Sequence, residues 1–331
     1  MSGEREATKG AAKSGHVIPP ELGGRPLDGI VRALFGASWG DARKWIASGK
    51  VEVDGKIVFD HERAVRAGVA VVLKMNAPKR TKADASAGAV TSLDDDAIVF
   101  VDAHVVVVNK PAGVSTIPFD EKESGTLDEL VRAWLSKRTK KGERSSRPSL
   151  GVVHRLDKQT SGVMVFTRTW LAKQSLAQQF RVHSVHRRYL AIAHGDVRAR
   201  TIRSHLLADR GDGIRGSLRP GARGKREEGQ LAITHVEPVE RLSQATLVAC
   251  KLETGRTHQI RVHLSEAGHP VVGEKVYIRG FADAGREPIL APRLMLHAAE
   301  LGFVHPATNV EVRFERPPPA DFEETLRRLR G

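Results

Sequence analysis

A long polar break divides this chain and prevents it from folding around one continuous core. Residues 76–96 carry Pro, Lys, Ser and Gly, a run of three Asp and few apolar side chains. Such a segment cannot bury enough apolar surface to offset the entropy lost when it is ordered. We therefore interpret 76–92 as a linker with a domain on each side. Residues 1–22 are rich in Gly, Ala, Lys and Glu without a period, which predicts a disordered tail.

The segment before the break, residues 23–75, has the pattern of a small α/β module. Apolar residues recur at helical spacing over 27–34, and residues 41–46 predict a second short helix. A hairpin with an Asp-Gly turn is predicted over 51–59, and a closing strand over 69–73.

After the break, short Val- and Ile-rich strands alternate with amphipathic helices. This interleaving predicts an α+β domain around a mixed sheet. Two Gly- and Arg-rich stretches, 137–148 and 209–229, are interpreted as surface loops. The predicted strands cover 97–101, 105–108, 151–153, 163–167, 189–193 and 246–252.

The charge balance favours a polyanionic partner. The formal net charge is +14, and cationic side chains that neutralise phosphates release bound counterions. A surface charge that serves only solubility is the alternative. Cys250 is the only cysteine, so neither an intrachain disulfide nor a cysteine-rich zinc cluster is expected. The chain lacks an apolar run of membrane-spanning length and a signal-peptide pattern, so we expect a cytoplasmic protein.

Asp157 is the first candidate for chemistry. It lies in the segment 151–162, between two apolar strands, and a reactive group is commonly carried on a loop with such rigid flanks. The alternative is that Asp157 only caps the turn through hydrogen bonds to the backbone of Thr160 or Ser161.

A second segment, residues 252–264, follows a strand and is predicted to open a helix with Thr254 as its N-cap. Arg256 then falls in the first turn, where a cation opposes the helix dipole. This local conflict suggests a phosphate or carboxylate nearby, although a tolerated surface arginine is also compatible. Arg256 and Ile260 would share one helical face.

Four ordered motifs together resemble the RluA-type family of RNA pseudouridine synthases. They are Asn109-Lys-Pro-Ala-Gly113, His154-Arg-Leu-Asp-Lys-Gln-Thr-Ser-Gly162, the Thr-Gly-Arg-x-His-Gln-Ile-Arg pattern that ends at Arg261, and Leu296-His-Ala298 followed by His305-Pro306. The similarity covers roughly residues 93–320. Residues 23–75 resemble an S4 RNA-binding module. The resemblance implies an α+β catalytic domain, residues 93–331, with a mixed, mainly antiparallel sheet.

The resemblance also implies roles for individual residues. Asp157 matches the essential aspartate, and Tyr189 matches the tyrosine that packs on the target base. Arg256 matches the arginine that pairs with the aspartate, and Ile260 an apolar contact beside it. Arg187 stands where the family usually has lysine, a change that keeps the charge but not the geometry. The further substrate-binding candidates are His154, Arg155, Arg187 and Lys110, and the RNA-binding candidates are Arg43, Lys44, Lys50, Arg188 and Arg261.

The chemistry explains why these residue types suffice. Uridine loses its C1′–N1 bond and rejoins through C5, with no redox change, so no cofactor and no metal are expected. Asp157 would either attack C1′ or remove the proton from C2′, and its carboxylate must be ionised in both routes. We expect Arg256 to lower the pKa of Asp157 and to aim its oxygens. The target base must also leave the stack before it can react.

Other signals are set aside. Residues 211–216 fit the spacing of a dinucleotide-binding loop but do not lie between a clear strand and a clear helix. His258, His263 and His269 are interpreted as surface or packing residues, because no carboxylate stands at metal-ligand spacing.

Two alternatives to an enzyme that acts on 23S rRNA stay open. One is an enzyme with a tRNA substrate, and the other is a non-catalytic RNA-binding factor in ribosome assembly. We expect a monomer that binds RNA and no membrane.

Overall fold

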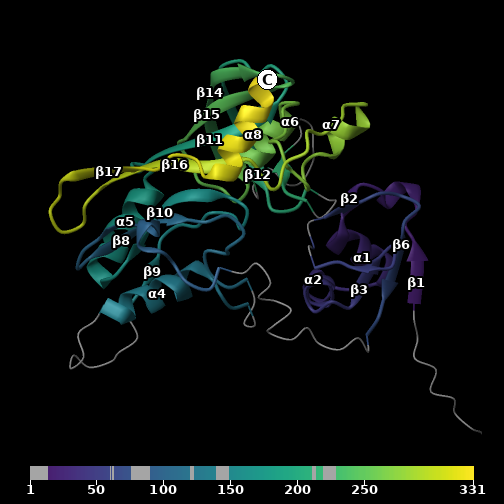
Figure 1. Ribbon diagram of the computed structural model, residues 1–331, viewed down its shortest axis with the longest axis horizontal. Coiled ribbons are helices and arrows are strands. Elements are labelled where there is room, and N and C mark those ends of the chain that lie inside the picture. Colours follow the sequence, from purple (N-terminus) through teal and green to yellow (C-terminus); the bar gives the residue numbers. More distant parts are fainter. Residues whose placement is uncertain are drawn as a thin grey trace, which may run out of the picture. The chain divides into compact units, whose positions relative to one another are not determined.

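The computed structural model describes residues 14–59, 61, 63–75, 90–119, 123–138, 149–210, 214–218 and 229–331. The chain divides into two compact units, Met1–Ala85 and Ser86–Gly331 (Figure 1). Each unit has its own hydrophobic core. Most of the predicted linker and of the basic loop 209–229 lies outside the described residues. So do the first part of the predicted tail and most of the predicted loop 137–148.

The N-terminal unit contains the two predicted helices, α1 and α2. Leu27, Ile30 and Val31 bury one face of α1. The hydroxyl of Ser38 caps α2 by accepting a hydrogen bond from the amide of Asp41. The elements are β1 (Ser14–Val17), η1 (Pro20–Leu22), β2 (Arg25–Pro26), α1 (Leu27–Phe35), α2 (Trp39–Ala47), β3 (Val51–Val53), β4 (Lys56–Ile57), β5 (Ala64–Val65) and β6 (Ala70–Leu73).

Part of the predicted tail is ordered. Strand β1 pairs antiparallel with β6, so that the four-stranded sheet has the order β1-β6-β3-β4. Ile18, directly after β1, is buried in the core of this unit. The prediction of disorder was therefore wrong for residues 14–22, where four strand residues and one isoleucine are enough to anchor a segment whose composition is polar. The likeness of this unit to an S4 module stays a prediction.

The second unit is built around one mixed sheet of eleven strands, and only the β10–β16 pair is parallel among the described strands. This confirms the predicted fold class. The main path has the order β13-β12-β14-β15-β11-β16-β10-β8-β7. Its strands are β7 (Ile98–Val101), β8 (Val105–Lys110), β9 (Gly151–Val152), β10 (Ser161–Thr167), β11 (His186–His194), β12 (Arg200–Leu207), β13 (Gly216–Ser217), β14 (Gln230–Leu242), β15 (Ala245–Leu252), β16 (Leu296–Val304) and β17 (Glu311–Glu315).

Helices cover both faces of the sheet. Alternate residues of a strand face opposite ways, so each face of the sheet presents apolar side chains that a helix can cover. Val106 and Val108 pack with α4, whereas Val105 and Val107 pack on the α5 side. Figure 1 shows β8 and β10 between these two helices. Helices α6 and α8 also belong to the core on the α4 side. The helices, with a 3-10 turn η2 (Asp95–Ala97), are α4 (Leu127–Arg138), α5 (Trp170–Arg181), α6 (Gln259–Glu266), α7 (Arg279–Asp283) and α8 (Ala320–Arg330). Among the described segments, no helix has the length and apolar content to cross a bilayer.

A close contact between β10 and β16 positions the loop before β10. Gly162 has φ 118°, and a Cβ atom there would lie 2.2 Å from the carbonyl oxygen of Ala298. Only glycine allows this approach. Ala298 pairs with Gly162 on one side and with Tyr189 on the other. The register therefore brings Tyr189 into one row with the end of the loop that carries Asp157.

Candidate active site

Buried side chains hold the main chain on both sides of Asp157. The Thr116 hydroxyl donates to the carbonyl of Leu156 (2.9 Å) and accepts from its amide (3.2 Å). On the other side, Lys110 Nζ donates to the carbonyl of Lys158 (3.1 Å), and Arg293 Nη1 to that of Gln159 (3.3 Å). The loop is thus fixed from three directions, which preorganises the carboxylate that it carries.

Lys110 has a structural role in this clamp. Its side chain is 0% exposed, and Nζ also donates to the carbonyls of Pro111 (3.0 Å) and Val114 (2.7 Å). Burial lowers its pKa to about 7, although the nearby charge of Asp157 acts in the opposite direction. The prediction that Lys110 contacts substrate was wrong for this geometry, because a buried ammonium with three carbonyl partners has no donor left.

Positive charges keep Asp157 ionised. Burial alone would raise the pKa of this carboxyl group, but His258, Arg261 and Arg155 outweigh burial, and the pKa lies below its ordinary value. Arg261 Nη1 lies 3.4 Å from Asp157 Oδ2, and His258 Nε2 lies 3.8 Å from the same oxygen. A carboxylate that must react as an anion is therefore available at neutral pH.

Arg261 is held by a second carboxylate behind it. Its Nε and Nη2 donate to the two oxygens of Glu274, at 2.8 and 2.9 Å, in a bidentate pair. Glu274 Oε1 also accepts from the backbone amides of Lys275, Val276 and Tyr277. The sequence predicts an RNA contact for Arg261, but its side chain is only 6% exposed. Arg261 is an internal partner of Asp157 instead.

Arg256 does not occupy the predicted place. Helix α6 begins at Gln259, so Arg256 precedes the helix, and its Nε donates to the carbonyl of Leu231 (3.0 Å). The side chain of Gln259 accepts from the amide of Arg256 and from the hydroxyl of Thr254. The helix cannot start earlier because His258 has a left-handed backbone, with φ 58°. The predicted N-cap at Thr254 and the predicted pairing of Arg256 with Asp157 were therefore wrong for this structure.

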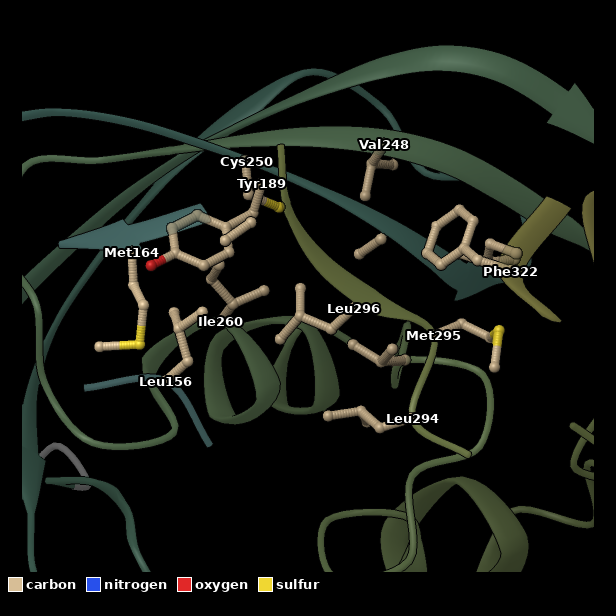
Figure 2. Close-up of a cluster of buried hydrophobic side chains, with 14 of the residues drawn as sticks. Leu156, Met164, Tyr189, Val248, Cys250, Ile260, Leu294, Met295, Leu296 and Phe322 are labelled. Carbon is tan, nitrogen blue, oxygen red and sulfur yellow. The ribbon is translucent and has the colours of Figure 1, made fainter. Parts of the chain in front are cut away.

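An apolar surface lies beside the carboxylate. Figure 2 shows the Tyr189 ring near Ile260 and Leu156, with Met164 close to its hydroxyl end. All four belong to the main core of the unit. Burial raises the pKa of Tyr189, so this hydroxyl stays protonated. The predicted neighbours Tyr189 and Ile260 are thus brought together.

The remaining substrate-binding candidates divide into one exposed and two enclosed side chains. Arg155 is exposed next to Asp157. His154 stacks on Phe180 (ring centroids 4.5 Å apart) and its Nε2 accepts from the amide of Val165, which fixes the loop to β10. Burial lowers the pKa of His154 to about 3, so this imidazole is neutral. Arg187 is buried, donates to the carbonyl of Glu253, and its Nε has no hydrogen-bond partner among the described residues.

The candidates for RNA binding lie in both units. Arg43 is paired with Asp28 at 2.8 Å, and Arg188 with Glu300 at 2.7 Å. Lys44 is exposed and Lys50 is half-buried. Arg219, Arg223, Lys225 and Arg226 of the basic loop lie outside the described residues.

Sequence reasoning missed His258 as a neighbour of Asp157 and did not consider Glu274, Thr116 or Arg293. His258 was interpreted as a surface or packing residue, because no carboxylate stands at metal-ligand spacing, and the αL backbone that turns it toward Asp157 leaves no mark in the sequence. A lone Glu274 before a Lys-Val-Tyr run gave no signal either. The sequence assigned Arg256 to Asp157 and Arg261 to RNA, and only the structure shows that Arg261 is the partner of Asp157.

Comparisons with known proteins show which family this chain is similar to. The family model described as RNA pseudouridylate synthase matches residues 104–266. The "Ribosomal large subunit pseudouridine synthase D" of Pseudomonas aeruginosa is 35% identical over 95% of this chain and 94% of its own length. The protein of the same name from Neisseria meningitidis serogroup B is 34% identical over 96% and 82%. A solved structure, "Human RNA Pseudouridylate Synthase Domain Containing 1", has a TM-score of 0.53 at 27% identity and covers 67% of this chain and 83% of its own.

Proposed function

This chain belongs to the RNA pseudouridylate synthase family, and from that premise we propose that it modifies large-subunit ribosomal RNA with Asp157 as its catalytic carboxylate. As an RNA pseudouridine synthase it isomerises uridine within an RNA chain.

Two observations support ribosomal RNA as the substrate. Relatives from Pseudomonas aeruginosa, Xylella fastidiosa and Neisseria meningitidis, with 34–35% identity over nearly the whole chain, carry the name of large-subunit synthases. The net charge of +14 suits a substrate with many phosphates. We propose that the N-terminal unit contributes RNA contacts through its exposed cations, including Lys44. Such an enzyme would act as a monomer in the compartment that holds ribosomes, and light scattering of the purified chain checks the monomer.

The observation that carries the role of Asp157 is its ionised carboxylate between Arg261 and an apolar surface. Arg261 donates to Asp157 Oδ2 and is itself fixed by both oxygens of Glu274. We assign to Arg261 the aiming role that the resemblance implied for Arg256. Asp157 then either attacks C1′ or removes the C2′ proton, and both routes start from the anion.

The apolar side of the site would hold the base. A uridine flipped out of its stack loses roughly a few kcal/mol, and stacking on the Tyr189 ring returns about 1–3 kcal/mol. Ile260 and Leu156 enclose the same surface. The exposed Arg155 beside Asp157 is suited to a phosphate of the flipped nucleotide.

A comparison of wild type with Asp157→Asn tests the proposal. Both proteins are incubated with total RNA from a strain that lacks this gene, and new pseudouridines are mapped by carbodiimide-blocked reverse transcription. We expect a new stop in large-subunit rRNA with wild type only. A stop that maps to tRNA would show that the substrate is tRNA and not ribosomal RNA. A stop produced by the Asn variant would remove Asp157 from the chemistry.

If neither protein produced a stop while both bound ribosomal particles, we would conclude that the chain is a non-catalytic RNA-binding factor in ribosome assembly.

A further inference from the structure

Arg187 is a buried cation that the protein leaves without a counter-charge. Only 6% of the residue is exposed, and no carboxylate in the described part of the chain forms an ion pair with it. Its Nη2 donates to the carbonyl of Glu253 (3.2 Å), while its Nε has no hydrogen-bond partner among the described residues. Burial lowers the pKa of Arg187, but a guanidinium stays protonated in a protein. A full positive charge is therefore enclosed there.

Two other arginines are enclosed to a similar extent, and both are balanced by a carboxylate. Arg261 pairs with Glu274 at 2.8 Å, and Arg293 pairs with Asp321 at 2.6 Å. A buried charge without such a partner lowers the stability of the fold far more than a paired one does. Local features that oppose stability in this way concentrate at functional sites. Arg187 is therefore suited to a negative charge that the substrate brings.

Arg187 lies beside the surface that we propose for the base. It precedes Tyr189 by two residues on β11, and these two residues are buried while Arg188 between them is partly exposed. Alternate strand residues share a face, so the two side chains leave the strand on the same side, about 7 Å apart along it. The charge of Arg187 acts on Tyr189 and on His154, which is three residues before Asp157.

The guanidinium of Arg187 is fixed by neutral groups. The carbonyl of Glu253 accepts from Nη2, and the ring of Phe180 has its centroid 5.7 Å from Cζ. Gly255 approaches so closely that a Cβ atom there would lie 2.4 Å from Nη1. These contacts hold the cation in place without neutralising it, which is the arrangement that stabilises charge developing in a transition state.

The reaction creates such a charge on the base. If Asp157 attacks C1′, its oxygen bonds to C1′ and the electron pair of the C1′–N1 bond leaves with the uracil. If Asp157 instead takes the C2′ proton, the C2′–H electron pair forms a C1′=C2′ double bond, and the N1 electron pair again leaves with the uracil. In both routes the detached uracil is an anion whose charge is shared among N1, O2 and O4.

We propose that Arg187 binds a carbonyl oxygen of the target uracil and stabilises this anion, an inference that rests on the proposed pseudouridine synthase activity. The interaction strengthens as the C1′–N1 bond breaks, so it lowers the barrier more than it tightens binding. The enclosure of Arg187 favours the base over a phosphate, because the flipped base is the part of the nucleotide that enters the apolar surface beside Tyr189. A phosphate is better matched to the exposed Arg155.

The test compares Arg187→Met and Arg187→Lys in the full-length chain on large-subunit rRNA transcripts. We expect Arg187→Met to lower kcat roughly 100-fold with little change in KM, and Arg187→Lys, which keeps the charge, to lose less. The thermal unfolding midpoint of Arg187→Met should equal or exceed that of wild type, because an apolar side chain avoids the burial of an unpaired charge. Arg313→Met, which removes an exposed arginine paired with Glu300, is the control and should match wild type in rate.

Transcripts made with 5-fluorouridine test the departing base itself. Fluorine withdraws electrons and makes the uracil anion more stable, so breakage of the C1′–N1 bond should depend less on Arg187. We expect the loss caused by Arg187→Met, relative to wild type, to be several-fold smaller on this RNA than on uridine RNA. Gly255→Ala, which displaces the guanidinium but keeps its charge, should show the same pattern. Nuclease digestion and chromatography measure the rates.

Two outcomes overturn the inference. A higher KM at unchanged kcat, with the slope of log Kd against log salt reduced by about one, would place Arg187 on a phosphate. An equal fold-loss on the two RNAs would show that Arg187 supports the structure of the site and not the departing base. Absence of product from wild type would instead contradict the proposed function, so the two failures are distinguishable.

Discussion

Two clusters of carboxylates and arginines lie in the second unit, and they differ mainly in burial. In the buried cluster, Glu274 holds Arg261, which reaches Asp157; the Glu274 side chain is 0% exposed. In the surface cluster, on β11, β16 and β17, Glu300 accepts from Arg188, Arg313 and His186. There Arg188 and Arg313 are 37% and 53% exposed, although Glu300 itself is only 11% exposed. The same pairing chemistry therefore has different consequences, because water screens the exposed arginines around Glu300 more than it screens the pair of Arg261 and Glu274.

The largest effect is expected at Glu274. Glu274→Gln removes the charge that balances Arg261 and weakens acceptance from three backbone amides. Breaking a buried pair typically lowers the free energy of unfolding by about 3–5 kcal/mol. Urea denaturation measures it, with Glu300→Gln as the matched control. A loss no larger than that of the control would contradict the contrast between the clusters.

The second largest effect is expected for Arg261→Met, on the pH dependence of activity. Asp157 has a pKa below its ordinary value, so its anion persists to low pH, and the stability linked to that anion is lost only as pH falls through the lowered pKa. Arg261→Met removes a cause of the lowering. The pKa of Asp157 should then rise, and the acid limb of kcat/KM should move to higher pH. An unmoved acid limb would mean that Arg261 does not tune the carboxylate.

A comparison of Arg256 with Arg261, which follows it in the same segment, tests which of the two arginines aims the carboxylate of Asp157. Because its Nε donates to the carbonyl of Leu231, we expect Arg256→Lys to keep the acid limb of wild type and to lower kcat/KM less than Arg261→Lys does. Single-turnover rates for the two lysine variants check the order. A reversed order would return the aiming role to Arg256, as the sequence alone suggests.

The smallest effect is expected at Glu300. Burial would raise the pKa of this carboxyl group, but hydrogen bonds from Arg313, His186 and Arg188 lower it. Glu300→Gln should lower the free energy of unfolding by about 1 kcal/mol or less at neutral pH, because exposed pairs are screened. The difference from wild type should shrink as pH falls through the pKa of Glu300. Activity on RNA should stay near that of wild type.

Patterns that depend on local chain chemistry were predictable. The helix over Leu27–Phe35, the strands that flank Asp157 and the neighbourhood of Tyr189 and Ile260 follow from periodicity and ordered motifs. Contacts that depend on tertiary register were not. Lys110 was predicted to bind substrate, and only the structure shows the three carbonyls that accept hydrogen bonds from it. His258 gives no sign of its left-handed backbone, which places Arg256 before helix α6, so the sequence assigned the pairing with Asp157 to Arg256 and not to Arg261.

The clamp around Asp157 determines when the conformational entropy of the loop that carries it is lost. Thr116, Lys110 and Arg293 fix the loop through its own backbone, from both sides of the carboxylate. The conformational entropy of this segment is therefore lost once, as the chain folds, and not again at each turnover. The binding energy of RNA is then free to open the stack around the target uridine. If the loop is already ordered before RNA binds, the Leu156 amide should exchange slowly with deuterated solvent in the absence of RNA.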